Sequence, residues 1–501
     1  MSFSTLPNNT NERWYRDPGL RWNVFHWDVS EDLVCDLTTD DMSLLTGLQA
    51  MPAWQEFFRH PTGTLLGLYA AIFYLPSIPA AFLGDFLADR YGRRTPIIAG
   101  CFIVGVGSLL NSLASSIAMW LIGRGVIGFG GGMAKVAAPA LIQEIAHPRL
   151  RPMLAACYWS FFHFGAILAA FMTFAGLYIE GDWSWRMPSM IQVIGPGTVF
   201  GVGFFLPESP RWLVKHRREN AALSVLAKYH ANGYVEDELV QWEMEQIRHA
   251  LAHEGSQASY LDFVKTPGNR RRLIIVLTLC VGLNWMGNGV ISYYLSPVLK
   301  MVGVTRPVEI TLINAGLAIW NLILALSASL STERLGRRRL FFISGWGMLL
   351  SYSVITALSA QFSQKGVKAV GLAVIPVLFI YYGFYSIAWT PLPVMYASEI
   401  LPFSLRTKGI ALFTAFGTGA NAFNQFVNAT ALSAIGWKYY LVYIGVIAAY
   451  LGIVHVLYAE TRGLSIEEIS KLFDKPEPEV APEGKKGEWI AGFVVSTDAS
   501  L

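Results

Sequence analysis

Two short loops carry the same run of residues, namely an acid, an arginine, any residue, a glycine and two arginines. The first loop runs from Asp89 to Arg94 and the second from Glu333 to Arg338. Arginine forms strong, often bidentate hydrogen bonds with carboxylates, and glycine allows a tight turn between two helices. The pattern therefore predicts arginines that bridge acids at neighbouring helix ends, with a purely orienting role in a membrane as the alternative.

A second repeated pattern indicates a duplication. The segment from Pro139 to Glu144 recurs as the segment from Pro393 to Glu399, and each is followed by a further proline and an arginine. Two different patterns repeated in the same order indicate two homologous halves.

Two cations interrupt the apolar stretch 117–142. Arg124 lies in the segment Gly123–Gly128, which matches the dinucleotide-binding pattern G-x-G-x-x-G, but no strand is expected before it and the match is spurious. An ionisable residue at this depth is costly unless it has a partner or borders a water-filled cavity. For Lys135 we expect snorkelling toward the outer interface or a role in helix packing, with a place on a cavity wall as the alternative.

The composition identifies the class of protein that must hold these charges. Of the 501 residues, 53% are hydrophobic and 15% are charged, whereas about 25% of the residues in soluble proteins are charged. Apolar runs of about 20 residues, each long enough to cross a bilayer, recur between Gly63 and Tyr458. The sequence therefore predicts an all-α membrane protein with many spans.

The sequence does not indicate a nucleic-acid-binding protein, a metal protein or an enzyme. The net charge of +3 is too small and too dispersed to predict a nucleic-acid partner. The four cysteines form neither a disulfide framework nor a metal cluster. The sequence has no constellation of nucleophile, metal ligands or phosphate loop, so we expect no enzyme, no metal site and no cofactor.

Eleven clear spans and one long polar stretch organise the chain. The domains predicted from them are a polar N-terminal segment 1–40, an N-terminal helix bundle 41–206, a cytoplasmic central loop 207–272, a C-terminal helix bundle 273–458 and a cytoplasmic tail 459–501. The positive-inside rule places both arginine loops and both termini in the cytoplasm. The spans are expected at 63–88, 96–116, 117–142, 153–178, 188–206, 273–299, 309–332, 339–360, 369–397, 407–433 and 436–458.

Two halves of six spans would require one more span near the start. Residues 22–40 carry five acids, which would cost on the order of 12–17 kcal/mol near a helix centre. The apolar segment 42–53 is too short to span alone. We therefore interpret segment 1–40 as a gene-model artefact, a retained intron or wrong first exon, with a genuine degenerate helix as the alternative.

These motifs resemble the major facilitator superfamily, and within it the sugar porters, across about residues 39–472. The resemblance implies a major facilitator fold, in which twelve helices form two pseudo-symmetric six-helix bundles around a central substrate site. In this chain the first helix is atypical or truncated. Residues 287–294 look most like the fungal hexose and lactose-permease-like branch. Beside the two arginine loops, the marks are Trp185–Pro188, Pro207–Leu213 and Glu460–Gly463.

The resemblance implies two sets of charged residues that act during transport. Asp41 faces Arg124 in the first, and this pair couples proton movement to sugar binding. The second set latches the cytoplasmic side in one of the two states of alternating access. One departure is Asp85, which takes the first position of the first loop motif, while Gly84 is displaced by one. The latch consists of Asp89, Arg90, Arg93, Arg94, Glu144, Glu208, Arg211, Glu333, Arg334, Arg337, Arg338, Glu399 and Glu460.

Sugars are held by amides that bond hydroxyls and by aromatic rings. Several positions depart from the family: its paired glutamines read Leu283 and Asn284 on the seventh helix, and its tenth-helix tryptophan is Val394, for which Trp389 could substitute. These losses weaken the case for glucose itself. The predicted substrate-binding residues are Asn284, Asn288, Tyr293, Tyr294, Asn321, Trp389, Trp159 and His163.

The resemblance predicts a transmembrane carrier for a hexose or disaccharide, with proton symport by alternating access. The expected partners are a small sugar, a proton and the lipid bilayer, and the expected location is the plasma membrane. Two alternatives stay open. The lost amides and the aromatic fifth and seventh helices would also fit an exporter of a small secondary metabolite, and the short tail 459–501 argues against a non-transporting sugar sensor.

Overall fold

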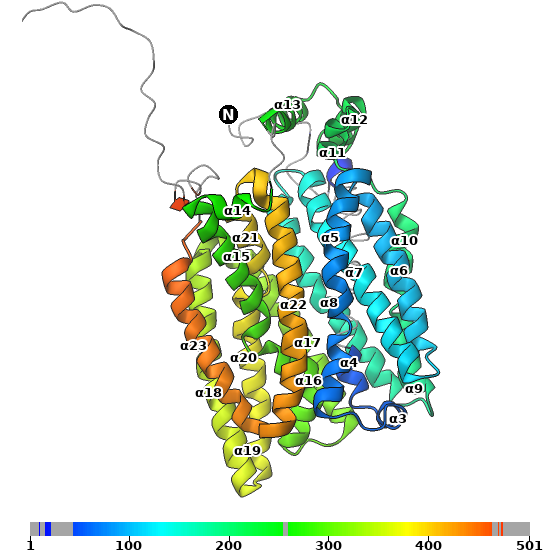
Figure 1. Cartoon of the computed structure of the whole chain (residues 1–501), viewed down its shortest axis with the longest axis vertical. Coiled ribbons are helices and arrows are strands. Elements are labelled where there is room, and N and C mark those ends of the chain that lie inside the picture. Colours follow the sequence, from blue (N-terminus) through cyan, green and yellow to red (C-terminus); the bar gives the residue numbers. More distant parts are fainter. Residues whose placement is uncertain are drawn as a thin grey trace, which may run out of the picture.

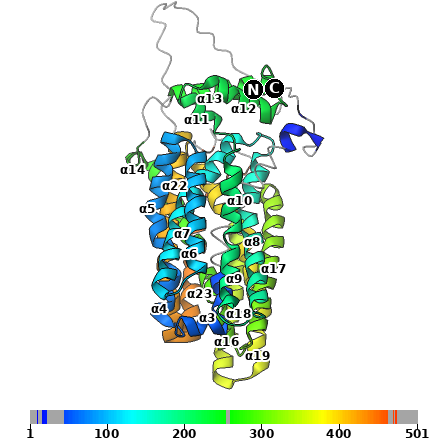
Figure 2. The same cartoon turned by 90° about the vertical axis from the view of Figure 1, so that its right-hand side faces the viewer.

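The computed structural model describes residue 10 and residues 16–21, 44–253, 259–462, 469 and 472–473. Most of these residues lie in helices that run along one long axis (Figures 1 and 2). Asp41 and the acidic stretch 22–40 lie outside the described residues, and so does the entry into the predicted first helix.

The first half contains long helices whose ends follow local sequence signals. The longest, α7, begins after Ser116, whose side chain accepts a hydrogen bond from the backbone N–H of Met119 and thereby caps the helix. The helices of this half are α3 (Pro52–Phe57), α4 (Gly63–Ala71), α5 (Tyr74–Tyr91), α6 (Arg94–Ser112), α7 (Ile117–Ile145), α8 (Arg151–Gly176), α9 (Trp183–Ile191) and α10 (Ile194–Gly203).

The second half repeats this pattern with an additional break. Helices α15 and α16 meet at Gly287, which has a φ of 98°, a conformation that glycine adopts without strain. The elements are α15 (Pro267–Trp285), α16 (Asn288–Met301), α17 (Pro307–Leu335), α18 (Arg337–Lys365), α19 (Lys368–Leu372), α20 (Val374–Ala388), α21 (Leu392–Ile400), α22 (Phe403–Ile435), the 3-10 helix η3 (Gly436–Tyr439) and α23 (Tyr440–Leu457).

Helices occupy all eleven of the spans predicted from the sequence, some as two shorter helices and the span 369–397 as three. Among the described residues, eight helical stretches are long and apolar enough to cross a membrane. The helices of each half lie together, and the halves meet along two seams, where α22 contacts α4 and α5 and where α17 contacts α8 (Figure 1).

Glycines bring helices of the first half into backbone contact. A methyl group at Gly128 of α7 would overlap the carbonyl oxygen of Phe73, immediately before α5. A methyl group at Gly84 of α5 would lie 2.7 Å from the carbonyl oxygen of Met133 on α7. Small residues at such crossings are how helices associate closely in lipid. The first half therefore packs as one tight unit.

The polar stretch 207–272 is folded rather than an open loop. Its helices α11 (Pro210–Lys215), α12 (Glu219–His230) and α13 (Glu238–His253) form a small cluster beyond one end of the bundles, and α14 (Asp262–Lys265) leads into α15 (Figures 1 and 2). The cluster has its own apolar core, which includes Trp212, Leu226, Val240 and Met244. We call this end of the molecule, with α11–α13 and the two arginine loops, the basic end.

Part of the N-terminal segment packs against this cluster. The Asn232 side chain accepts a hydrogen bond from the Gly19 N–H at 2.8 Å and donates one to Asp17 at 2.9 Å. Leu20 is fully buried. Residues 16–21 thus lie at the basic end, while the interpretation of segment 1–40 as a gene-model artefact stays a prediction.

Replacing Gly128 with alanine should destabilise the protein, because the methyl group would push α5 away from α7. Overpacking of this kind costs about 1–3 kcal/mol. Thermal unfolding of the purified protein in detergent measures the effect. Gly201→Ala on α10 is the matched control, since nothing lies within 4 Å of the added methyl. Equal melting temperatures for both variants would contradict the close packing.

Candidate functional site

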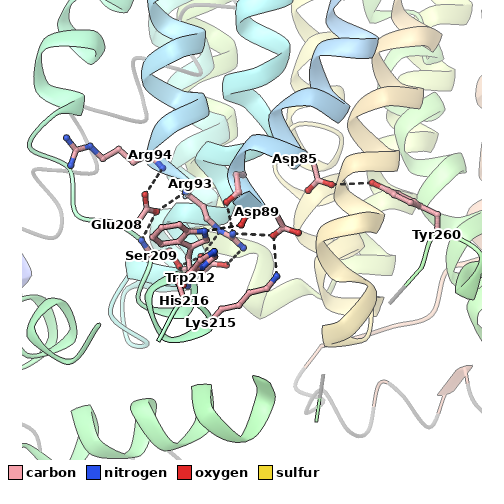
Figure 3. Close-up of polar contacts among 12 residues, drawn as sticks. Asp85, Asp89, Arg93, Arg94, Glu208, Ser209, Trp212, Lys215, His216 and Tyr260 are labelled. Carbon is pink, nitrogen blue, oxygen red and sulfur yellow. Dashed lines mark hydrogen bonds and ion pairs between the residues drawn. The ribbon is translucent and has the colours of Figure 1, made fainter. Parts of the chain in front are cut away.

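A buried arginine–glutamate pair holds the first arginine loop. The Arg93 guanidinium donates to Glu144 on α7 through Nε at 3.2 Å and Nη2 at 3.3 Å, and both side chains are 10% exposed. Asp89 also contacts Arg93, at 3.4 Å (Figure 3). Ser209 donates a hydrogen bond to Glu144. The neighbouring carboxylates raise the pKa of Arg93 despite its burial.

Glu208 fixes the turn of the same loop through its backbone. Its carboxylate accepts hydrogen bonds from the backbone N–H groups of Arg93 at 2.8 Å and Arg94 at 3.3 Å. Burial raises the pKa of Glu208, and these N–H donors oppose that rise. Gly92 has a φ of 97°, and a methyl group there would overlap Glu208. Glycine is required both for the turn and for the carboxylate.

The second arginine loop repeats this geometry. Arg337 donates to Glu399 at 2.8 Å, and the backbone N–H groups of Arg337 and Arg338 donate to Glu460 at 2.9 and 3.1 Å. Gly336 has a φ of 86° and lies against Glu460. Arg93 with Glu144 and Arg337 with Glu399 are the side-chain pairs of the two loops, and each pair lies within its own half. Their role as a latch stays a prediction.

The other residues predicted for the latch are placed less centrally. Arg90 is exposed and lies over the Tyr91 ring, and Arg211 is partly exposed at the start of α11. The side chains of Glu333 and Arg334 lie outside the described part of the structure. Asp89 also contacts Lys215 at 3.8 Å, which joins the loop to α11 (Figure 3).

Asp85 contacts the polar stretch 207–272, which in turn contacts the second half. The Tyr260 hydroxyl donates to Asp85 on α5 at 3.4 Å (Figure 3). The Lys408 ammonium of α22 lies 5.0 Å from the centre of the Tyr260 ring. Burial, together with Asp85, raises the pKa of Tyr260 to about 12, so its hydroxyl keeps the proton that it donates. Asp85, the residue that departs from the family motif, therefore forms a polar contact with Tyr260 at the basic end.

A cavity of about 250 Å³ lies between the two halves. Lining residues come from α5, α7 and α8 of the first half and from α15, α16, α17, α20, α21 and α22 of the second. Its wall reaches from Tyr293, near the middle of the molecule, to Pro139 and Ile410, nearer the basic end. Such a position suits a solute that both halves must contact.

Five of the eight predicted substrate residues line this cavity: Asn284, Asn288, Tyr293, Asn321 and His163. Tyr294 and Trp389 do not: the Tyr294 hydroxyl donates to the Gln425 carbonyl, and Trp389 packs against Phe341 and Tyr450. The Trp159 side chain lies outside the described part of the structure. Sequence reasoning missed Asn314, Asn421, Tyr382 and Tyr385, which line the cavity from α17, α20 and α22.

The break between α15 and α16 positions the polar groups of the wall. Carbonyl groups near a helix end lack intrahelical donors, and the hydroxyls of Tyr385 and Tyr381 donate to those of Leu283 and Met286, each at 2.8 Å. Tyr385 in turn accepts a hydrogen bond from Asn288 at 3.0 Å. The break at Gly287, which falls within the continuous span predicted at 273–299, therefore creates this part of the site.

Two amide groups on the wall have hydrogen-bonding capacity to spare. Asn288 Oδ1 and Asn314 Nδ2 are buried and make no hydrogen bond within the described residues. A buried polar atom without a partner costs about 1–3 kcal/mol. Because both residues line the cavity, these two atoms are candidates for bonding a hydroxylated solute.

Hydrogen bonds join the two halves on the side of the cavity away from the basic end. Pro297 has no N–H, so the Tyr293 carbonyl lacks its helical donor. Gln49 supplies one at 3.0 Å, and Thr46 donates to the Ser292 carbonyl. The hydroxyls of Tyr74 and Tyr293 lie 2.9 Å apart.

The two intramembrane cations differ in their surroundings. Arg124 is 3% exposed, and its guanidinium lies 4.9 Å from the centre of the Trp120 ring and 5.9 Å from that of Phe73. Its predicted partner, Asp41, lies outside the described residues. Lys135 lines the cavity, which is the alternative role for this residue rather than the snorkelling that we expected.

Known proteins resemble this chain over most of its length. A family model described as "Sugar (and other) transporter" matches residues 31–473. The chain is 29% identical to the MFS-type transporter criB of Aspergillus cristatus (87% of this chain, 90% of that one) and 26% identical to the arabinose-proton symporter of Bacillus subtilis (82% and 87%). A high-affinity glucose transporter of Kluyveromyces lactis is 25% identical (86% and 82%).

Solved structures share the fold. The major facilitator proton:xylose symporter XylE, bound to 6-bromo-6-deoxy-D-glucose, aligns with a TM-score of 0.76 and 20% identity, covering 91% of this chain and 100% of that one. The match confirms the predicted major facilitator fold.

Arg93→Ala should destabilise the protein strongly, because it leaves the Glu144 carboxylate buried without its cation. Breaking a buried pair in this way costs about 3–5 kcal/mol. Arg90→Ala in the same loop is the matched control: Arg90 is exposed, and such changes cost at most about 0.5 kcal/mol. Melting temperatures in detergent compare the two variants. A loss no greater for Arg93→Ala than for Arg90→Ala would assign the arginines a purely orienting role.

Proposed function

The chain belongs to the sugar transporter family of the major facilitator superfamily, and from this premise we propose that it carries sugars across a membrane by alternating access, with proton symport. The observation that carries the proposal is the cavity between the halves, whose wall combines amides with tyrosines. Asn288 and Asn314 offer unused hydrogen-bonding atoms to sugar hydroxyls. The proposal assigns the chain transport and no catalytic activity.

The geometry of the halves supports alternating access. Each half is held together internally, by glycine crossings in the first and by an arginine–glutamate network in both. The contacts between the halves combine helix packing along the two seams with polar contacts such as that of Tyr74 with Tyr293. Two compact units with a breakable interface can rock about a central site.

The distribution of basic residues supports an orientation. We place the basic end in the cytoplasm, together with α11–α13 and both termini, since short basic loops stay on that side. In this orientation the contacts made by Gln49 and Tyr293 close the outer side, and the cavity extends toward the cytoplasm. We propose the plasma membrane as the location, where a sugar importer would meet its substrate.

Proton coupling is proposed for Asp41 and Arg124. Arg124 is buried among aromatic rings, and a carboxylate near such a cation either pairs with it or takes up a proton. The relatives that support coupling are the arabinose-proton symporter and the proton:xylose symporter.

A second candidate function is export of a small secondary metabolite. Four tyrosines line the cavity, together with Phe73 and Phe413, so the wall could also hold an aromatic solute. Direction separates the two functions: an importer raises the internal concentration of its solute, and an exporter lowers it.

Uptake of radiolabelled sugars, in a host without its own hexose carriers, tests the proposal. Asn288→Ala should weaken the transport of an accepted sugar by about fivefold to 150-fold, because a sugar hydroxyl loses its partner. Asn111→Ala is the control, since Asn111 is a buried amide on α6 away from the cavity. Absence of uptake for every sugar, or equal rates for both variants, would refute the sugar site.

Asp41→Asn should abolish uphill, pH-driven accumulation while sugar still exchanges down a gradient, because the amide cannot release a proton. The adjacent change Asp40→Asn is the control and should retain accumulation. Uptake is followed in proteoliposomes with and without an inward proton gradient. Uphill uptake by Asp41→Asn would show that another group couples the proton.

A further inference from the structure

The partners of the cavity amides fix which end of each amide is left for a solute. An asparagine side chain offers either a donor, its nitrogen, or an acceptor, its oxygen, whereas a backbone carbonyl can only accept a hydrogen bond. Any group that bonds a carbonyl must therefore be a donor. This rule assigns the orientation of an amide from its hydrogen-bond network.

The orientation of Asn288, at the start of α16, follows from its contact with Tyr385. The Tyr385 hydroxyl donates its one proton to the Leu283 carbonyl at 2.8 Å, so its oxygen must accept from Asn288. The Asn288 atom that lies 3.0 Å from this oxygen is therefore the nitrogen, Nδ2. Asn288 lines the cavity, and its Oδ1 is buried without a hydrogen bond among the described residues.

Asn284, near the end of α15, has the same polarity. Its Nδ2 group donates to the Cys280 carbonyl at 2.9 Å and to the Gly417 carbonyl at 3.2 Å. An amide nitrogen carries two protons, so these two contacts use both. The oxygen is then the group with which Asn284 can bind a solute in the cavity that it lines. The helices on both sides of the break at Gly287 thus offer acceptors.

The amides of α17 have the opposite polarity. Asn321 Oδ1 accepts a hydrogen bond from the Ser386 hydroxyl at 3.2 Å, which leaves its nitrogen for a solute. Asn314 Nδ2 is buried and has no partner in the part of the chain that the structure describes. Both residues line the cavity. The wall therefore presents acceptors from α15 and α16 and donors from α17.

We propose that Tyr385 and Ser386 are positioning residues that set this polarity, so that the substrate must donate from the hydroxyls that face α15 and α16 and accept at those that face α17. This inference rests on the proposed function of the same cavity. The two residues are neighbours on α20, and each holds an amide by the atom that the solute does not use. An ether or ketone oxygen beside Asn288 is rejected, because two acceptors would then face each other.

Sugar analogues that lack only a donor test this polarity. Fluorine is close to a hydroxyl in size and accepts hydrogen bonds weakly but cannot donate one, whereas the hydrogen of a deoxy sugar does neither. D-glucose, D-galactose and D-xylose, with their monodeoxy and monodeoxyfluoro analogues, compete for uptake of the radiolabelled parent sugar by the full-length protein in proteoliposomes. At one or more positions both changes should weaken competition about tenfold or more, with fluorine no better than hydrogen. At one or more other positions fluorine should be tolerated better than hydrogen.

Variants of the two positioning residues separate polarity from packing. Tyr385→Phe frees the Asn288 amide to turn, so fluorine should become better tolerated than hydrogen at the first kind of position. Ser386→Ala should remove the advantage of fluorine at the second kind. Tyr381→Phe is the matched control, because the Tyr381 hydroxyl donates to the Met286 carbonyl beside the same break. Any loss in this control should be equal for all analogues.

The outcomes separate this inference from the proposed function. Sugar uptake in which fluorine is tolerated alike at every position would overturn the inference and leave the sugar carrier intact. So would folded Tyr385→Phe and Ser386→Ala variants that keep the pattern of the unmodified protein. The pattern in the unmodified protein decides the polarity even where a variant does not fold. Absence of uptake for all three sugars would overturn both proposals.

Discussion

The pairing of one buried arginine with one glutamate in each half is the interaction on which the rest of the basic end depends. Arg93 with Glu144, and Arg337 with Glu399, tie the turn after one helix to the end of another. A charge without a partner at this depth would be expensive, so these loops adopt one arrangement. The turn glycines and the backbone contacts of Glu208 and Glu460 then follow from that arrangement.

Rigidity within the halves contrasts with the interface between them. Backbone contact at Gly128 leaves α5 and α7 no freedom to separate. The two seams carry the cavity and side-chain contacts such as that of Tyr74 with Tyr293, beside the packing of α22 on α4 and α5 and of α17 on α8. Motion that changes access to the cavity is therefore expected along these seams and not inside either half.

Most of the fold could be predicted because the signals in the sequence reflect physical requirements and occur in both halves. The length of the apolar runs located the spans, and the two repeated loop motifs located the arginine pairs. Positions that depend on tertiary geometry were harder. Asn314, Asn421, Tyr382 and Tyr385 line the cavity but carry no local signal in the sequence. Tyr382 and Tyr385 are held by carbonyl groups beside the break at Gly287, which is a tertiary feature. Trp389 is an aromatic residue near the expected position, yet it packs behind the wall.

The same reasoning did not predict that the polar stretch 207–272 is folded. Its charge indicated a loop, but the spacing of Trp212, Leu226, Val240 and Met244 builds a separate core. A hydrogen bond from Trp212 to the Asp89 carbonyl at 3.0 Å attaches this core to the first arginine loop. The contact between Lys215 and Asp89, at 3.8 Å, joins α11 to the same loop. Helices α11–α13 are therefore expected to move together with the first half when the two halves move relative to each other, so a spectroscopic label on α13 would follow the first half.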